Sequence, residues 1–241
     1  MTARCTVIDI DFDFQKEANY RDSDRYSPTL REYHRLLWSK QLPNGNTFTL
    51  TPIANNCLKY LSPQGDEWIL SSDRAVASFT KPASMQPLID KIGKDEVADF
   101  KKLTDTIGGI IIWPAKKIDN KITINGHRGF SPKIADRLDL TMECLRRYYL
   151  GQDSPLFETF SRYSGYFDLF LDFRGFVDFF LMNDYVDDDY SRCVIAKPYD
   201  KNFNKIGRPT TVEEYRSYIS STSDLVKRRN QRIADWAKYN L

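Results

Sequence analysis

The stretch GIIIW at residues 109–113 predicts the centre of a sheet. It is continuously apolar and rich in β-branched side chains, and Pro114 ends it. A short run of this kind is typical of a strand that is buried on both faces. We therefore interpret residues 109–113 as a central buried strand and assign the rest of the chain around it.

Several other segments predict further strands. Residues 4–14 alternate between apolar residues and aspartates, which indicates a strand with one charged face. We interpret these aspartates as charges that protect a sheet edge, although they could also bind a hard divalent cation. The turn Asp119-Asn120 predicts a hairpin into the next strand. The predicted strands besides residues 109–113 are residues 6–14, 47–53, 57–61, 68–70, 121–125 and 193–196.

Two Ser-Pro pairs predict helix starts, with the serine as N-cap and the proline at the first helical position. They are Ser27-Pro28 and Ser131-Pro132. Apolar residues at helical spacing predict the remaining helices. The predicted helices are residues 27–40, 85–107, a helix that begins at residue 131, two helices within 155–184 broken near Gly165 or Gly175, and one or two helices within 212–238.

Strands and helices are mixed without a regular β-α-β alternation, which predicts an α+β fold. We expect a mostly antiparallel N-terminal sheet packed against a Phe-rich C-terminal helical layer. Aromatic residues make up 14% of the chain, with 15 Phe and 14 Tyr, and many of them fall within residues 157–181. We expect that segment to be buried and residues 1–241 to form a single domain.

Charge and cysteine content exclude several classes of protein. The net charge of +2 excludes a globally basic coat for nucleic acid but allows a local basic patch. The apolar segment 166–185 contains too many aspartates to span a membrane. Without a CxxC pair, a compact zinc site is not expected, and no other metal or cofactor motif is present. We expect a cytoplasmic protein without a membrane partner, a metal ion or a cofactor.

Several stretches of the chain, taken together, resemble a known protein family. The stretches are SPTLREYHRLLWSKQLPNG (27–45), EWILSSD (67–73), GGIIIWP (108–114), ITINGHRGFSPKIADRLDLTMECLRRYY (122–149), FVDFFLMND (176–184) and RRNQRIADW (228–236). Together they resemble a bacterial family that is known only as a domain of unknown function. The resemblance covers nearly the whole chain and implies no activity, although it suggests a toxin or phage-defence context.

The first candidate site is the segment Asn125–Gly129. Two glycines flank His127 and Arg128, which would let the backbone approach a ligand closely. The helix predicted to begin at Ser131 would offer free N–H groups to an anion. Asn125, Arg128 and Lys133 are therefore candidate anion-binding residues, and His127 is a candidate acid or base. A simple turn before a capped helix is the alternative.

The second candidate site is the helix that begins at Ser27. His34 borders its apolar stripe, and nearby arginines would lower its pKa and favour a neutral base. Arg31 and Lys40 are candidate anion-binding residues of the same cleft. A buried structural histidine is the alternative.

The third candidate site lies on the helix predicted to begin at Ser131. Glu143 stands among arginines, so it is a candidate general base, and Arg137 is a candidate anion-binding residue. A solvated, salt-bridged helix face is the alternative.

These candidates favour an enzyme that acts on a nucleotide or nucleic-acid phosphate, either a nuclease or an ADP-ribosyl-type transferase. This function requires His34 and residues 125–143 to meet in one pocket. One alternative is a non-catalytic nucleic-acid-binding module that uses the basic final helix. The other is a protein-interaction module. We favour the enzyme because polar residues concentrate beside predicted strands, where sites usually form.

Overall fold

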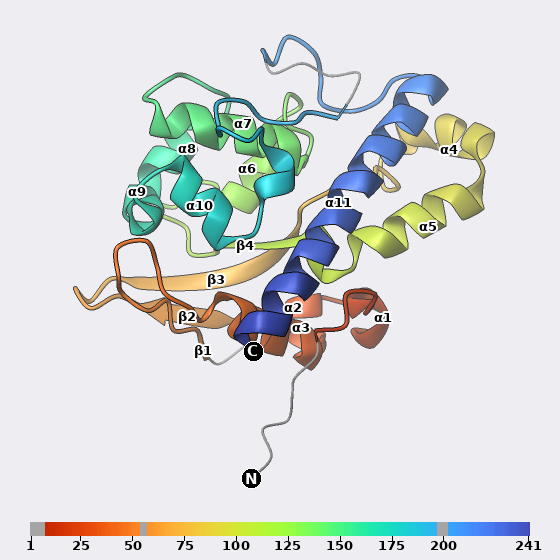
Figure 1. Ribbon diagram of the computed structural model, residues 1–241. Coiled ribbons are helices and arrows are strands. Elements are labelled where there is room, and N and C mark those ends of the chain that lie inside the picture. Colours follow the sequence, from red (N-terminus) through yellow and green to blue (C-terminus); the bar gives the residue numbers. More distant parts are fainter. Residues whose placement is uncertain (1–7, 54–56, 197–201) are drawn as a thin grey trace.

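The computed structural model describes residues 8–53, 57–196 and 202–241. Its sheet has four antiparallel strands in the order β1-β2-β3-β4 and comes from the N-terminal half of the chain (Figure 1). The C-terminal half is mostly helical, so the predicted α+β class is confirmed. The strands are β1 (Thr51–Pro52), β2 (Leu58–Leu61), β3 (Glu67–Arg74) and β4 (Ile110–Pro114).

Apart from α11, the helices form three groups around the sheet, namely α1–α3, α4–α5 and α6–α10. The long helix α11 crosses the molecule between the second and the third group (Figure 1). In order, the helices are α1 (Phe14–Glu17), α2 (Ser23–Tyr26), α3 (Pro28–Trp38), α4 (Gln86–Ile92), α5 (Lys94–Thr104), α6 (Ile124–Phe130), α7 (Leu138–Tyr149), α8 (Phe157–Arg162), α9 (Ser164–Phe167), α10 (Phe173–Phe179) and α11 (Val212–Asn240).

The two faces of β3 contact different helices. Successive side chains of a strand point to opposite faces of the sheet. Ser72 lies on the face that α3 covers, because its hydroxyl is 2.8 Å from His34 Nε2. Asp73 lies on the other face, where it pairs with Arg128 of α6. The strand therefore separates the N-terminal helices from the α6–α7 region.

β4 is buried as predicted, but it is the end strand of the sheet rather than a central one. The Phe-rich segment packs against side chains on both faces of the sheet beside β4. Trp113 stacks on Phe176 with ring centroids 5.8 Å apart. Tyr166 contacts Trp68, which lies on the opposite face of the sheet. The predicted burial of the Phe-rich segment is confirmed.

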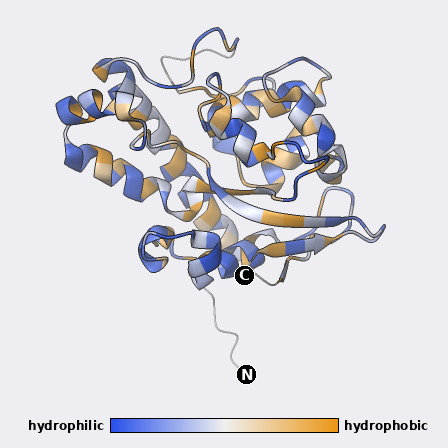
Figure 2. Ribbon diagram, turned by 180° about the vertical axis from the view of Figure 1, so that it is seen from behind, coloured by the Kyte–Doolittle hydropathy of each residue, from blue (hydrophilic) through white to orange (hydrophobic). Residues whose placement is uncertain are grey.

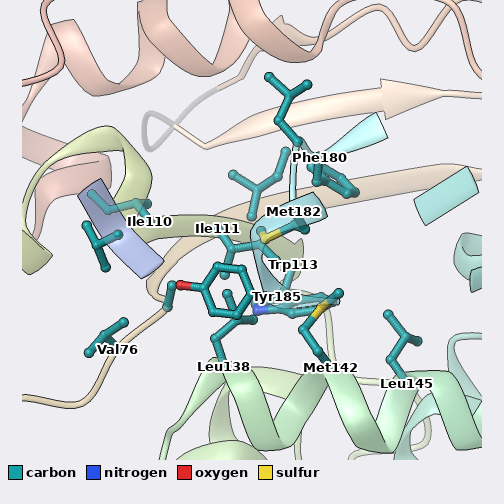
Figure 3. Close-up of a cluster of buried hydrophobic side chains, with 14 of the residues drawn as sticks. Val76, Ile110, Ile111, Trp113, Leu138, Met142, Leu145, Phe180, Met182 and Tyr185 are labelled. Atoms are coloured by element: carbon teal, nitrogen blue, oxygen red, sulfur yellow. The ribbon is translucent and has the colours of Figure 1, made fainter. Parts of the chain in front are cut away.

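Figure 3 shows how this core is filled around β4. Trp113 lies between Met142 of α7 and Met182, which follows α10. All three side chains are fully buried. The turns of α4 and α5 mix hydrophilic and hydrophobic residues, as expected of helices with one face on the core (Figure 2).

The strand predicted at residues 6–14 is wrong for the described part, residues 8–14, and residues 4–7 lie outside the described residues. The aspartates bond to nearby backbone instead of lining a strand. Asp9 accepts from the N–H of Asp11 at 2.9 Å, and Asp13 caps α1 by accepting from Lys16. Short acidic side chains favour turns and helix caps for this reason.

The region between β4 and α7 also differs from the prediction. Residues 124–130 form α6 rather than a strand and a glycine-rich turn. Thr123 caps this helix, with its hydroxyl accepting from the N–H of Gly126 at 3.2 Å. Ser131-Pro132 begins a turn, and α7 starts only at Leu138.

Three further boundaries differ. The single helix predicted at residues 85–107 is split at Gly93, whose φ of 115° is left-handed. The strand predicted at residues 47–53 is reduced to β1, and the one at residues 193–196 to an isolated bridge between Val186 and Cys193. The helix predicted after Ser27 is confirmed, with the serine hydroxyl accepting from the N–H of Leu30.

Candidate functional site

A cleft of about 670 Å³ opens beside the C-terminal end of β3. Five separate segments line it. They are Gln15 and Tyr20 near α1, residues 74 and 76–82 at and after the end of β3, Lys101 of α5, residues 129–132 and 135–136 at and after the end of α6, and Ile206 and Arg208 before α11. We call it the basic cleft.

Basic side chains outnumber acidic ones on the walls of the basic cleft. Arg74, Lys81, Lys101 and Arg208 line it, together with one carboxylic acid, Asp136. Cations from separate segments that converge on one concave surface concentrate the local field and attract anions. The basic cleft is therefore suited to an anionic ligand.

Aromatic and apolar side chains stand exposed at the same cleft. Phe130 is 81% exposed, Tyr20 is 70% exposed and Ile206 is 44% exposed. Apolar side chains that are exposed together around one cleft can mark a binding site. A flat apolar group could pack on Phe130 or Tyr20 while an anionic group contacts the cations.

Four residues of the basic cleft have a left-handed backbone although none is glycine. The φ angle is 57° at Tyr20, 54° at Phe79, 50° at Ala135 and 62° at Asp136. Each such position costs about 1–3 kcal/mol, and such strain gathers at functional sites that the surrounding structure holds in place. The concentration of strain supports the basic cleft as the functional site.

A buried arginine supports the wall of the cleft from behind. Arg128 is fully buried and pairs with Asp73 and, at 3.6 Å, with Asp136. It also donates to Thr141 Oγ1 at 3.0 Å and to the carbonyl oxygens of Arg74 and Asp136. Burial raises the pKa of Asp136, and the charge of Arg128 opposes that rise. Arg128 thus orients Asp136 and does not reach the ligand space itself.

Arg74 is held by a second ion pair. Its Nε donates to Asp105 Oδ1 at 2.6 Å, and its side chain remains 29% exposed. The carboxylate of Asp105 is nearly buried, at 5% side-chain exposure. This partner fixes the guanidinium at the cleft, where it can contact an anion without a large loss of side-chain entropy.

His34 is placed as a structural histidine. Its Nδ1 accepts a hydrogen bond from Trp38 Nε1 at 3.0 Å, so its proton is on Nε2, which faces Ser72 Oγ. Burial lowers the pKa of His34 to about 3, and the charge of Arg229 adds to this. Neither nitrogen is available to a substrate. Arg31, on the same helix, donates to the carbonyl oxygen of Asp24.

His127 and Asn125 lie on α6, across β3 from His34. His127 Nδ1 is 2.6 Å from Thr159 Oγ1, which turns the ring toward α8. Asn125 Nδ2 is 3.5 Å from Ser71 Oγ. The two predicted polar segments therefore occupy opposite faces of the sheet, and the structure does not bring His34 and His127 together.

The candidates on α7 and in the turn before it are also separated from one another. Glu143 is fully buried and accepts from Arg146 and Arg147 at 2.9 Å each. Arg137 is fully buried against Asp139 and donates to the carbonyl oxygens of Ala196 and Gly207. Lys133 is exposed in the turn, where the N–H groups of the next two residues bond to Ser131 and are not free for an anion.

Lys40 lies in a different place, enclosed by aromatic rings. Its Nζ is 4.5 Å from the ring centroid of Trp236, 4.9 Å from Phe179 and 5.2 Å from Trp38. Ring faces favour the ammonium form by about 0.5–2 kcal/mol. Removing an ammonium from water opposes this by several kcal/mol, so desolvation prevails. Burial lowers the pKa of Lys40 to about 7.

The four cations of the basic cleft were not selected from the sequence. They lie on three separate segments, with Arg74 and Lys81 on the first, Lys101 on the second and Arg208 on the third, and only the fold brings them together. The predicted segment 125–143 does border the cleft, through residues 129–132, 135 and 136, but the candidate Lys133 is not among the lining residues. The sequence thus indicated one wall of the cleft, for the wrong local reason, because that wall is a helix end and a turn rather than a glycine loop.

Two searches of the described ranges gave negative results. No group of three or more His, Cys, Asp or Glu side chains is arranged to hold a metal ion within residues 8–53, 57–196 and 202–241. Over the same ranges, every helix is too short or too polar to cross a membrane.

Comparison with known proteins gives the family but no activity. No curated protein and no solved structure shows a significant match to the chain. A model of a family of unknown function matches residues 8–233, which include the sheet, the aromatic layer and every described residue that lines the basic cleft. The chain therefore belongs to the family of unknown function DUF6994.

Proposed function

We propose that this protein binds a nucleotide, or the phosphate of a nucleic acid, in the basic cleft. The observation that carries the proposal is the convergence of Arg74, Lys81, Lys101 and Arg208 on one cleft with exposed aromatic rings. Guanidinium and ammonium groups bind phosphate by charge-assisted hydrogen bonds. Aromatic side chains stack on bases regardless of their sequence. A nucleotide combines both groups in one ligand.

An enzyme that acts on this phosphate extends the same proposal. Asp136 is the one carboxylic acid among the cleft's described lining residues, and burial raises its pKa while Arg128 opposes the rise. A carboxyl group held in a site can act as a general acid or base. In this version Asp136 takes the acid or base role that the sequence suggested for His34, His127 or Glu143. A nuclease or an ADP-ribosyl-type transferase would use the cations to hold the phosphate.

Binding is tested with a matched pair of lysines on α5. Lys101 lines the cleft, whereas its neighbour Lys102 is exposed and does not. Calorimetry with ATP, NAD and a short single-stranded oligonucleotide should show binding by the wild type. Lys101→Ala should weaken it about tenfold, as expected for the loss of a charge-assisted contact. Lys102→Ala should bind as the wild type does.

The outcomes separate a site from general charge attraction. Equal weakening by Lys101→Ala and Lys102→Ala would mean that the ligand responds only to net charge. Absence of binding to all three probes by the folded wild type would contradict the proposal. The variant Asp136→Asn distinguishes an enzyme from a protein that only binds. In an enzyme, it should abolish turnover of a bound probe and leave the affinity for that probe nearly unchanged.

A single strand of nucleic acid is a second candidate ligand because Phe130 and Tyr20 are so exposed. A mononucleotide has one base to stack, whereas a strand can use both rings. Phe130→Ala should therefore weaken oligonucleotide binding more than ATP binding if the strand is the ligand. Circular dichroism confirms the fold of each variant.

A further inference from the structure

Lys40 is a partly exposed lysine that the basic cleft does not use. It follows α3 and lines a separate cavity of about 460 Å³, between residues 40–43 and the region of α10. None of the described residues that line this cavity also lines the basic cleft. Its function is therefore independent of the proposed nucleotide site.

Aromatic rings surround the Lys40 amine, and Asp172 and Asp178 line the same cavity. Rings from three helices enclose Nζ, namely Trp38 of α3, Phe179 of α10 and Trp236 of α11. Among the described residues, Lys40 takes part in no ion pair. The nearby carboxylate of Asp178 is engaged by Arg174 and by the hydroxyl of Tyr190.

An amine in such surroundings loses its proton easily. Burial lowers the pKa of Lys40 to about 7, and the charge of Arg229 adds to the shift, while Asp178 opposes it. Desolvation in an apolar pocket is one of the ways in which a lysine becomes a nucleophile near neutral pH. The amine also borders open space rather than packed core, so a small molecule can reach it.

We propose that Lys40 is a nucleophilic amine that forms a Schiff base with a small aldehyde or ketone bound in this cavity. The cavity walls indicate the rest of that molecule. The polar residues Gln41, Asp172, Arg174 and Asp178 line one part of the cavity. The apolar residues Pro43, Phe170, Leu171 and Phe179 line another part. They suit a carbonyl compound with an aromatic or branched apolar group.

The chemical step is a condensation without oxidation or reduction. The lone pair of the neutral amine forms a C–N bond to the carbonyl carbon, and the C=O electron pair moves to oxygen, which takes up a proton. The nitrogen releases one proton. Loss of the oxygen as water then leaves a C=N bond, so amine and carbonyl compound give an imine and water.

The test uses benzaldehyde as the probe and cyanoborohydride to trap the imine in the full chain. At about pH 7, mass mapping of peptides should show Lys40 alkylated at least about tenfold faster than Lys102, because an exposed lysine is almost fully protonated there. The rate at Lys40 should level off with rising benzaldehyde, which shows that the cavity binds it. Lys40→Arg should lose the fast reaction.

Two variants separate this role from a merely buried lysine. Trp236→Ala opens Nζ to water, which favours the ammonium at about pH 7, so labelling of Lys40 should slow there toward the rate of Lys102. Asp178→Asn removes a charge that favours the ammonium, so labelling should be faster below pH 7. Circular dichroism verifies that both variants are folded.

Two results would overturn the proposal. Labelling of Lys40 in the wild type at the rate of Lys102 would show that the amine is not activated. Fast labelling that stays proportional to benzaldehyde concentration would show an activated amine whose cavity binds no aldehyde.

Discussion

At the scale of single residues, burial of polar side chains couples the stability of this protein to pH. His34 is 1% exposed and neutral in the folded state, with its ring between Trp38 and Ser72. Its pKa is lowered to about 3, chiefly by burial. In the unfolded chain the ring binds a proton near pH 6.5. His34 therefore contributes stability that is complete above about pH 6.5 and declines as the pH falls toward 3.

Replacing His34 by glutamine should reveal this contribution. Below the pKa of His34 in the unfolded chain, the contribution of His34 to the free energy of unfolding falls by about 1.4 kcal/mol per pH unit. Between pH 7.5 and 5 the loss is about 2 kcal/mol. The difference in unfolding free energy between the wild type and His34→Gln should shrink by that amount over this range. Urea unfolding at both values measures it. Because the carboxyl groups are common to both proteins, their own pH dependence cancels. A constant difference would contradict a neutral buried His34.

The sequence suggested that Arg128 binds an anion, whereas its place in the structure predicts that it stabilises the fold. Its full burial against Asp73 means that Arg128→Met leaves a carboxylate without its partner. Breaking a buried pair in this way costs about 3–5 kcal/mol. Urea unfolding should show this loss, and adding Asp73→Asn should recover part of it. Arg35→Met is the control, because its exposed pair with Glu32 contributes under about 1 kcal/mol. A folded, equally stable Arg128→Met protein would restore Arg128 as a candidate ligand.

At the scale of elements, local patterns predicted those segments whose ends carry their own signal. Ser27 and Pro28 fix the start of α3. The serine hydroxyl accepts a hydrogen bond from the backbone, and proline has no N–H group, which the first helical position does not need. The same letters at Ser131 and Pro132 do not begin a helix. There the chain turns so that Ala135 and Asp136 take left-handed φ and Arg128 can reach Asp136, a tertiary arrangement that no local pattern contains.

Gly93 and Gly129 allow a matched test of helix boundaries. A Cβ atom at either position would meet no atom within 4 Å, so only the backbone conformation differs. Gly93→Ala should destabilise the protein by about 1–2 kcal/mol, because φ is 115° there and unfavourable for a side chain. Gly129→Ala, inside α6, should be neutral or stabilising by up to about 1 kcal/mol. Thermal and urea unfolding measure both, and equal effects would refute the split between α4 and α5.

At the scale of the whole molecule, composition predicted the layers but not the site. The Phe-rich segment could only be buried, and it covers β4. Residues 166–190 are rich in aspartate and the final helix is basic, and an ion pair joins them, since Arg232 Nε donates to Asp184 at 2.9 Å. The basic cleft could not be predicted because its cations come from three segments that are far apart in the sequence.

The helix α11 joins the parts of the fold into one unit. It contacts α4, α5, η3 (Ile107–Gly109) and η5 (Asn183–Tyr185). Arg229, fully buried, donates to the carbonyl oxygens of Gly108, Ile110 and Phe180 at 3.0, 2.8 and 3.2 Å. A single side chain thus links the start of β4 to the aromatic layer. Asn230 accepts from the N–H of Gly108 at 2.6 Å, and a Cβ atom on that glycine would lie 2.5 Å from the same oxygen.

This linkage predicts that sheet and helices unfold together. Arg229→Met should destabilise the protein by about 3 kcal/mol, since hydrogen bonds from a charged donor to three buried carbonyl groups are lost. Arg228→Met, at the exposed neighbouring position, should change stability by less than about 0.5 kcal/mol. Near-ultraviolet circular dichroism follows Trp38 and Trp113 in the core, and far-ultraviolet signals follow the helices. The two curves should coincide in all three proteins, because α11 leaves neither layer a complete set of partners without the other. Separate transitions in the wild type would show that the layers fold independently, and a normal Arg229→Met curve would show that the three carbonyl contacts do not connect them.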